Sequence, residues 1–388
     1  MKLHILSLIQ LFGCLAAGAQ SAFAPAIRHA VDADPVIAAA EARGAAEVAG
    51  VEAENVPDGP EVDFEHLWSA RPDVRNKWNI GVNQEFSLPG VYKARGRAAA
   101  AMSEGNAAAR QLMRLDRALD IKLAIVDLID AYRRLNLQME IRGNLDRIDE
   151  LTRRAFDSGN ATILDSRKMQ LAVLDNDNTL AAIRADIERL MATLSSMNVN
   201  IDDLTPGMLS EYPAMPLRAA DYSPLERVAE SRKAAAKAQS TVASRSAWPT
   251  FSLGYRHAYE DGTHFNGLGV SVRLPQWSRS KRTRAAELEA VAASFDAEAD
   301  RLAFRAESDA LMRQATADAL NIERYRDLTS DNTYLGLLQK AFDAGQLSVI
   351  DYLTEINLFT TARLNYLELE YRQALTLTRL GRYVSEDF

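Results

Sequence analysis

Residues 155–165 read AFDSGNATILD, and residues 341–351 read AFDAGQLSVID. The same offset of 186 positions that relates these stretches also relates Leu88-Pro89 to Leu274-Pro275. Two landmarks keep one spacing, with no insertion or deletion between them. The chain therefore contains a duplicated unit, because a short motif that recurs by chance would not carry its flanks with it.

The composition is that of a folded, non-fibrous protein. Of the 388 residues 47% are hydrophobic, and there are only 19 glycines and 12 prolines. The net charge of −8 argues against nucleic acid as a partner, since phosphate contact needs a basic surface. The single cysteine, Cys14, excludes an intramolecular disulfide and a cysteine-based metal cage.

The first residues predict export. Lys2 precedes an apolar run that ends in small residues, which is the pattern of a signal peptide over residues 1–19, cleaved before Gln20. A second candidate cleavage site ends at Ala24. In an alternative interpretation, Leu11-Phe12-Gly13-Cys14 is a lipoprotein signal and Cys14 becomes acylated. No later stretch has the ~18 apolar residues of a transmembrane helix.

Each half then begins with a short helix and two strands. Residues 34–53 and 222–245 are predicted helices, opened by Asp34-Pro35 and Ser223-Pro224. After each helix the apolar residues alternate, which predicts strands wetted on one side. The clearest alternations are Ile80, Val82, Gln84, Phe86, Leu88 and Leu268, Val270, Val272, Leu274. Polar connections are expected at residues 69–77 and 260–266.

Long helices follow the strands. No proline occurs over residues 91–156 or 277–342, and both runs are rich in Ala, Leu, Arg and Glu. A helix of such a run would span roughly 100 Å, far longer than a helix of an ordinary globular domain. Each must bury its apolar stripe on neighbouring helices, as in a coiled coil.

The opening motif marks the end of each long helix. Gly159 and Gly345 stand where a glycine can adopt the left-handed conformation that terminates a helix. Helical periodicity resumes within three or four residues, so the chain must fold back antiparallel. Asp165 and Asp351 fall in the first turns of the returning helices, where a carboxylate favours the helix dipole. The sequence thus predicts a mainly α protein with two strand pairs and two helical hairpins, in repeats over residues 20–205 and 206–388.

This order resembles the TolC family of outer-membrane efflux factors, over nearly all of the mature chain. The resemblance rests on the duplication, the two equal hairpins and the G-x-x-x-x-x-D tips, Gly159 to Asp165 and Gly345 to Asp351. Residues 84–97, QEFSLPGVYKARGR, resemble the strand-to-helix junction of the CzcC-like heavy-metal branch. The resemblance implies a homotrimer in which four strands per subunit form a shared twelve-stranded β-barrel in outer-membrane lipid.

The resemblance also implies partners and a site. The protein would lie in the outer membrane of a Gram-negative bacterium, extend into the periplasm, and dock a membrane-fusion adaptor at its hairpin tips. The adaptor would connect it to an inner-membrane pump of the RND or ABC type. By position, the adaptor-docking residues are Gly159, Asn160, Ala161, Gly345, Gln346 and Leu347.

Several side chains allow two interpretations. Asp157, Asp165, Asp343 and Asp351 either ring an entrance and favour cations, or cap and solvate the helix ends. His257 and His264 flank a hairpin and are expected to form a surface pair.

The basic residues 93–97 and 279–284 are expected at the headgroup boundary. The tryptophans near strand ends belong either to an aromatic girdle or to the core. These are Trp78, Trp248 and Trp277.

No motif for catalysis, a metal site or a cofactor is present, so no enzyme activity, metal or cofactor is expected. We therefore expect a passive, gated duct for small molecules or metal cations, working in tripartite efflux or type I secretion. The alternative is a periplasmic coiled-coil scaffold such as the adaptor, which usually carries one hairpin per chain.

Overall fold

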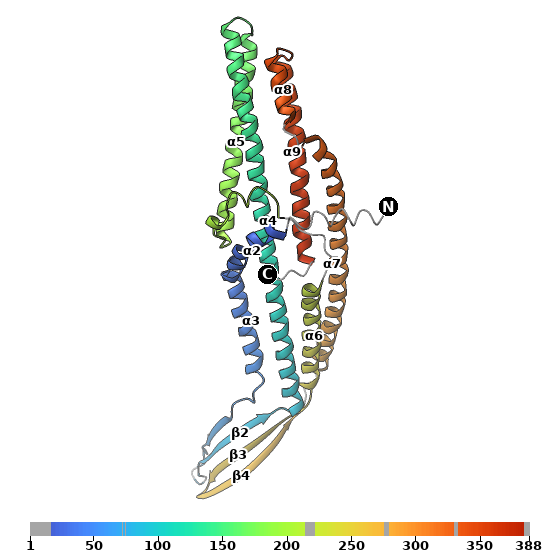
Figure 1. Cartoon of the computed structure of the whole chain (residues 1–388). Coiled ribbons are helices and arrows are strands. Elements are labelled where there is room, and N and C mark those ends of the chain that lie inside the picture. The colour runs from blue at the N-terminus through green and yellow to red at the C-terminus, as the bar shows by residue number, and fades with distance from the viewer. Residues whose placement is uncertain are drawn as a thin grey trace, which may run out of the picture. The chain divides into compact units, whose positions relative to one another are not determined.

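The computed structural model describes residues 17–71, 73, 75–213, 222–274, 279–329 and 333–383 (Figure 1). In the first half the elements are α2 (Ala17–Asp32), α3 (Pro35–Ala53), β1 (Glu61–Leu67), β2 (Lys77–Phe86), α4 (Pro89–Asp157) and α5 (Ile163–Ser196). In the second half they are α6 (Ser223–Arg245), β3 (Thr250–Glu260), β4 (Thr263–Arg273), α7 (Arg279–Thr329), α8 (Thr333–Asp343) and α9 (Val349–Leu380). Short 3₁₀ turns occupy Ile201–Asp203 and Gly381–Tyr383.

The duplicated order is visible in these bounds. Each half runs from a short helix through two strands to a helical hairpin, and α4 and α8 end at Asp157 and Asp343, at the 186-residue offset. The predicted mainly α fold with strand pairs is confirmed. The second long run is described as α7 and α8, and residues 330–332 between them lie outside the described residues. The predicted signal peptide lies outside them up to residue 16, Cys14 included, and stays a prediction.

The chain forms two compact units, and each takes segments from both repeats. The strand unit comprises residues 36–112 and 223–303, and the hairpin unit comprises residues 1–35, 113–222 and 304–388. The repeat boundaries at residues 20–205 and 206–388 therefore describe the duplicated sequence, whereas the compact units cut across both copies.

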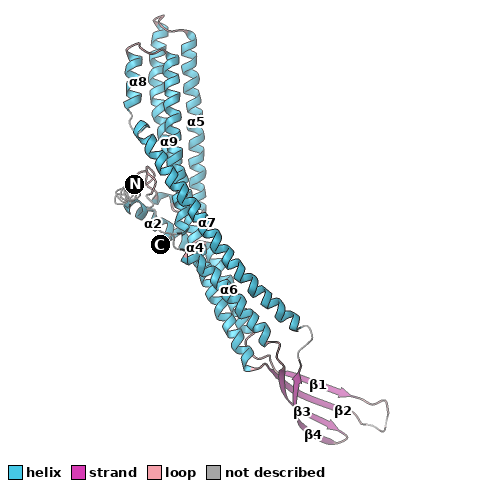
Figure 2. Ribbon diagram, turned by 90° about the vertical axis from the view of Figure 1, so that its right-hand side faces the viewer, coloured by secondary structure: helices cyan, strands magenta, loops and turns pink. Residues whose placement is uncertain are grey.

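The strand unit contains one antiparallel sheet in the order β1-β2-β3-β4 (Figure 2). The predicted hairpins are confirmed, but the predicted connection over residues 260–266 is too long. Asp261 and Gly262 alone join β3 to β4, with φ of 47° and 83°. Two successive positive φ values give the tight turn whose twist matches that of the flanking strands, and Asp-Gly is a preferred sequence for it.

Four helical segments accompany the sheet in this unit. Asn106 of α4 donates its side-chain N–H to the carbonyl of Gly44 in α3, at 3.1 Å. Arg301 of α7 pairs with Glu226 and Glu230 of α6, at 3.3 and 3.6 Å. These exposed and half-exposed polar contacts specify which helices are neighbours. They add little to the free energy of unfolding, since ion pairs near the surface contribute little.

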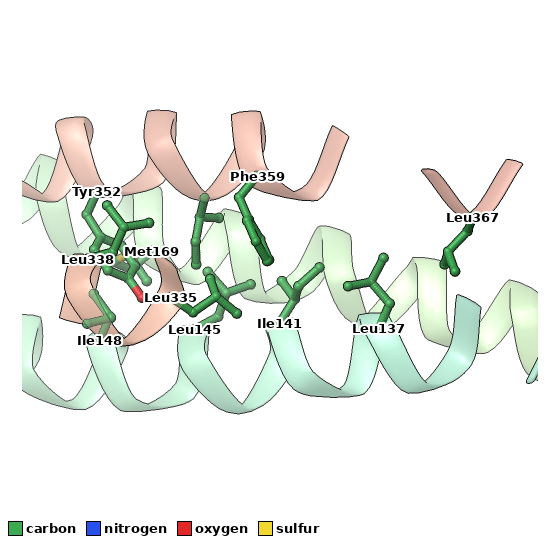
Figure 3. Close-up of a cluster of buried hydrophobic side chains, with 11 residues drawn as sticks. Leu137, Ile141, Leu145, Ile148, Met169, Leu335, Leu338, Tyr352, Phe359 and Leu367 are labelled. Atoms are coloured by element: carbon green, nitrogen blue, oxygen red, sulfur yellow. The ribbon is translucent and has the colours of Figure 1, made fainter. Parts of the chain in front are cut away.

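The hairpin unit is held by an apolar core between the two hairpins (Figure 3). Side chains of α4 and α5 from the first repeat meet side chains of α8 and α9 from the second. The buried members are Leu137, Ile141, Leu145, Ile148, Met169, Leu335, Leu338, Tyr352, Ile356, Phe359 and Leu367. Burial of this stripe is what allows helices of such length to be stable.

Ion pairs between α4 and α9 help to fix how the two helices are aligned along their length. Arg133 and Arg134 of α4 reach Glu370 and Glu368 of α9, both at 2.6 Å. Asp130 receives hydrogen bonds from Arg134 and from the hydroxyl of Tyr212, and its burial raises its pKa above the ordinary value. Desolvation offsets much of the attraction in such pairs, but a slipped register would leave a buried charge unpaired.

Truncation of the core tests this packing. Ile148→Ala removes a fully buried side chain and should lower the free energy of unfolding by about 2–5 kcal/mol. The matched control is Leu171→Ala, on the exposed side of α5, with an expected change within about 0.5 kcal/mol. Unfolding of both variants by denaturant would check this, and equal losses would contradict the assigned core.

Candidate functional site

The tips of the two hairpins are built by the same backbone hydrogen bonds. In the first tip, the N–H of Gly159 donates to the Phe156 carbonyl at 2.9 Å, and the N–H of Asn160 to the Ala155 carbonyl at 2.7 Å. In the second, Gly345 and Gln346 donate to the equivalent carbonyls, both at 2.9 Å. This pair of bonds is the Schellman motif, which requires a left-handed residue after the helix. Gly159 and Gly345 supply it, with φ of 76° and 69°.

The returning helices begin with capping boxes. The Thr162 hydroxyl accepts the N–H of Asp165 at 3.2 Å, and the Thr162 N–H donates to the Asp165 carboxylate at 3.1 Å. Ser348 and Asp351 repeat both bonds at 3.2 and 3.3 Å. The two aspartates are at the helix starts, as predicted, but Thr162 and Ser348 were not among the predicted residues. The signal was present, because a hydroxyl residue three positions before an acidic one marks a capping box.

The four carboxylates near the tips differ in their surroundings. The pKa of Asp165 is lowered by hydrogen bonds from Thr162, and that of Asp351 by hydrogen bonds from Ser348. Asp343 pairs with Arg147 at 3.4 Å and accepts a hydrogen bond from Gln339, whereas Asp157 is exposed at the helix end. Capping therefore accounts for Asp165 and Asp351. The entrance ring of carboxylates stays a prediction.

Most of the predicted docking residues are accessible. Gly159, Asn160, Gly345 and Gln346 are exposed. Ala161 is half-buried, and Leu347 packs partly against the core of the hairpin unit.

Exposed apolar side chains extend each tip. Leu164 is 66% exposed and Ile350 is 49% exposed, although both continue the apolar periodicity of their helices. Periodicity alone cannot separate a stripe that faces the neighbouring hairpin from one that faces solvent. A shallow groove of about 520 Å³ lies close by, lined by Arg147, Leu151, Phe342 and Asp343.

The sheet of the strand unit is the second candidate element, because apolar side chains cover one of its faces. Paired residues share a face, so the two faces can be compared row by row across the sheet. One row reads Val62, Val82, Tyr255, Leu268, and the row beside it, on the other face, reads Asp63, Gly81, Arg256, Gly267. Leu268 and Val270 are 82% and 74% exposed. An exposed apolar face of this kind marks a surface that contacts lipid or another protein.

The other predicted residues have mixed outcomes. His257 and His264 do pair, with ring nitrogens 3.2 Å apart. Trp78 contacts the rings of His257 and Tyr259 on the sheet, and Arg245 lies over Trp248. Trp277 lies outside the described residues, as do residues 275–278 around it. Among the described residues, no group of three or more His, Cys, Asp or Glu could hold a metal ion, and no helix is long and apolar enough to cross a membrane.

The left-handed glycines give one prediction. Gly345→Ala should destabilise the second tip by about 1–2 kcal/mol, because no described atom lies within 4 Å of the added Cβ and the cost is backbone strain alone. Gly336→Ala, in the body of α8 with equally open surroundings, should stabilise by about 0.5–1 kcal/mol. Opposite signs in denaturant unfolding would support the tip geometry, and stabilisation by both variants would contradict it.

The capping carboxylates give a prediction about pH. Their pKa is lowered in the folded tip, so their stabilisation is complete above the ordinary value of 3.8 and is lost as the pH falls through the lowered pKa. Pepsin cleavage at the tips should therefore rise steeply below about pH 4. The double variant Asp165→Asn, Asp351→Asn should be cleaved faster than the wild type at the highest pH tested. Its cleavage rate should also depend less on pH. An unchanged dependence would exclude these carboxylates as the titrating caps.

Comparisons with known proteins agree with these features. Residues 26–197 match the family model described as outer membrane efflux protein. A search of curated proteins found no significant match.

Solved structures match over almost the whole chain. The outer-membrane channel OprN is 16% identical, with a TM-score of 0.78 over 94% of this chain and 89% of that one. The outer membrane protein VceC of Vibrio cholerae is 16% identical, with a TM-score of 0.75 over 93% of this chain and 95% of that one. The open-state MtrE channel of Neisseria gonorrhoeae is 16% identical, with a TM-score of 0.70 over 92% of this chain and 88% of that one.

Identities this low show the fold. The narrower resemblance to the CzcC-like branch gains no support from these matches and stays a prediction. The family is one of efflux proteins and not of enzymes. Residues 26–197 thus match the outer membrane efflux protein family model, and the chain as a whole shares its fold with outer-membrane channels such as OprN and VceC.

Proposed function

We propose that the protein is the outer-membrane exit duct of a tripartite efflux system, in a Gram-negative bacterium. It acts as a homotrimer that reaches into the periplasm, where a membrane-fusion adaptor joins it to an RND-type pump. Type I secretion with an ABC pump uses the same kind of duct. Conduction is passive, and the inner-membrane pump supplies the energy.

The observation that carries this proposal is the sheet with one exposed apolar face. Strands of ten or eleven residues, as in β2, β3 and β4, have the length that a tilted strand needs to cross a bilayer. Hydrocarbon contains no water to satisfy open strand edges, so a four-stranded sheet must continue into other sheets. Two further copies of the chain would continue it into a closed twelve-stranded wall, apolar outside and polar inside.

The polar face of the sheet suits the inside of such a wall. It carries small and hydrogen-bonding residues, with Asn79 donating to Glu65 at 2.8 Å and Asn83 to Asp63 at 3.1 Å. A Cβ on Gly81 or Gly254 would collide with the side chains of Asp63 or Asn83. The glycines thus make room for a polar layer that crosses the strands.

The hairpin tips are the proposed adaptor contact and gate. Their turns expose backbone at Gly159 and Gly345, which permits another helix to approach closely, and bulky residues there would prevent it. The apolar side chains beside each turn, such as Leu164 and Ile350, supply area to bury. The tips close the entrance by coiling together, and adaptor binding lets them separate.

The scaffold alternative accounts for fewer features. A periplasmic adaptor would carry one hairpin per chain and would not expose apolar residues along a sheet. The two hairpins and the row that ends in Leu268 therefore favour the duct.

Planar-bilayer recording of the detergent-purified protein tests the proposal. The wild type should give discrete conductance steps that depend on the trimeric species. Leu268→Lys places a charge on the apolar face and should abolish or strongly reduce insertion, since Lys costs about 2–4 kcal/mol at the bilayer midplane. Gly267→Lys places the same charge one residue away on the polar face, where no described atom is within 4 Å of the added Cβ, and should still insert.

A third variant separates docking from conduction. Gly345→Trp should retain the steps and lose adaptor binding in a pull-down, because the tip lies outside the strand unit. A monomer that needs no detergent and gives no steps would rule out the duct. If both lysine variants inserted equally well, the face that carries Leu268 would not be the lipid-facing side.

A further inference from the structure

Two histidines meet on the β3–β4 hairpin, beside its two-residue turn. His257 Nε2 lies 3.2 Å from His264 Nδ1. The ring planes differ by 28° and the ring centroids are 5.2 Å apart, so the rings meet at their edges and their nitrogen atoms face each other. Neither histidine takes part in the proposed docking or gating.

A neighbouring amide fixes the protonation of one ring. Asn266 Oδ1 lies 2.7 Å from His257 Nδ1 and also accepts a hydrogen bond from the Tyr255 hydroxyl at 2.7 Å. A carbonyl oxygen only accepts, so His257 carries its proton on Nδ1 and presents the lone pair of Nε2. A metal-bound histidine typically has this arrangement, with its second nitrogen donating to a carbonyl or carboxylate.

The spacing of the two nitrogens also suits a metal. Two imidazole nitrogens bound at 2.0–2.1 Å to one tetrahedral ion stand about 3.3 Å apart. When an ion replaces the hydrogen bond between the rings, His264 moves its proton from Nδ1 to Nε2. Both rings stay neutral, and no proton needs to be released.

The surroundings limit the protein ligands to these two. The carboxylates nearest in sequence are engaged elsewhere, since Glu260 pairs with Lys77 at 2.6 Å and Asp261 with Arg75 at 3.5 Å. Water would fill the other positions, which His264 and Asn266 leave open because both are exposed. Aromatic rings restrain the pair from the sides, with Trp78 5.5 Å from His257 and Tyr259 5.0 Å from His264.

We propose that His257 and His264 form a binding site for one borderline divalent transition-metal cation per chain, with Asn266 orienting His257. Imidazole suits Cu²⁺, Ni²⁺ and Zn²⁺, and the general order of affinities places Cu²⁺ first among these. The alkaline-earth cations are excluded, because they require oxygen ligands. The site is independent of the duct proposal, since it needs only the folded hairpin.

Calorimetric titration of the purified full-length protein with Cu²⁺, in detergent, tests the site. His257→Ala and His264→Ala should each lose one bound Cu²⁺ per chain. Asn266→Ala should keep the stoichiometry and weaken binding by about 10- to 100-fold, as loss of an orienting partner does. His66→Ala removes an exposed histidine from the same sheet, separated from His264 by strands β2 and β3, and should change nothing.

Electron paramagnetic resonance of the bound Cu²⁺ gives a second readout that folding defects do not imitate. The wild type should show coupling to two nitrogens, and either alanine variant should lose it. The proposal is overturned if both variants keep the wild-type number of bound ions, or if His66→Ala removes as much Cu²⁺ as His264→Ala. Circular dichroism would confirm that each variant retains its strands.

Discussion

The backbone of the four-stranded sheet imposes the constraint on which the rest of the protein depends. Its outer strands, β1 and β4, have no further strand partner within the described chain, and one face exposes apolar side chains such as Leu268 and Val270. In the bilayer proposed above, the apolar face would meet lipid, but the open edges could not persist in a single copy, since every unpaired N–H and C=O costs several kcal/mol in hydrocarbon. The proposed oligomer would supply the hydrogen-bond partners that these sheet edges lack.

The hairpin unit meets a different requirement with the same duplicated sequence. Helices as long as α4 need partners along their length, and the chain supplies them by folding back at Gly159 and Gly345. Each tip closes with bonds within its own backbone and with its own capping box. These local bonds define the turn, and the glycines and the residues after them stay exposed at its surface.

Much of this arrangement could be predicted from the sequence because the decisive signals are local. Alternation of apolar and polar residues predicted the strands, and proline-free runs predicted the long helices. The glycines of the repeated motif predicted the turns between helices. The Asp261-Gly262 turn was predicted to be longer than it is, because the polar residues around it have the composition of a loop. The exposure of Leu164 and the meeting of His257 with Asn266 depend on which faces and strands come together, which periodicity does not specify.

Disulfide cross-linking between the outer strands measures the central claim most directly. Single cysteines would be placed along β1 and along β4 in a Cys14→Ser background and oxidised in native membranes. The account predicts that pairs from both strands yield dimers and trimers at a consistent register, while cysteines on β2 or β3 do not cross-link between chains. A chain that stays monomeric at every β1 and β4 pair would contradict the shared sheet and with it the duct.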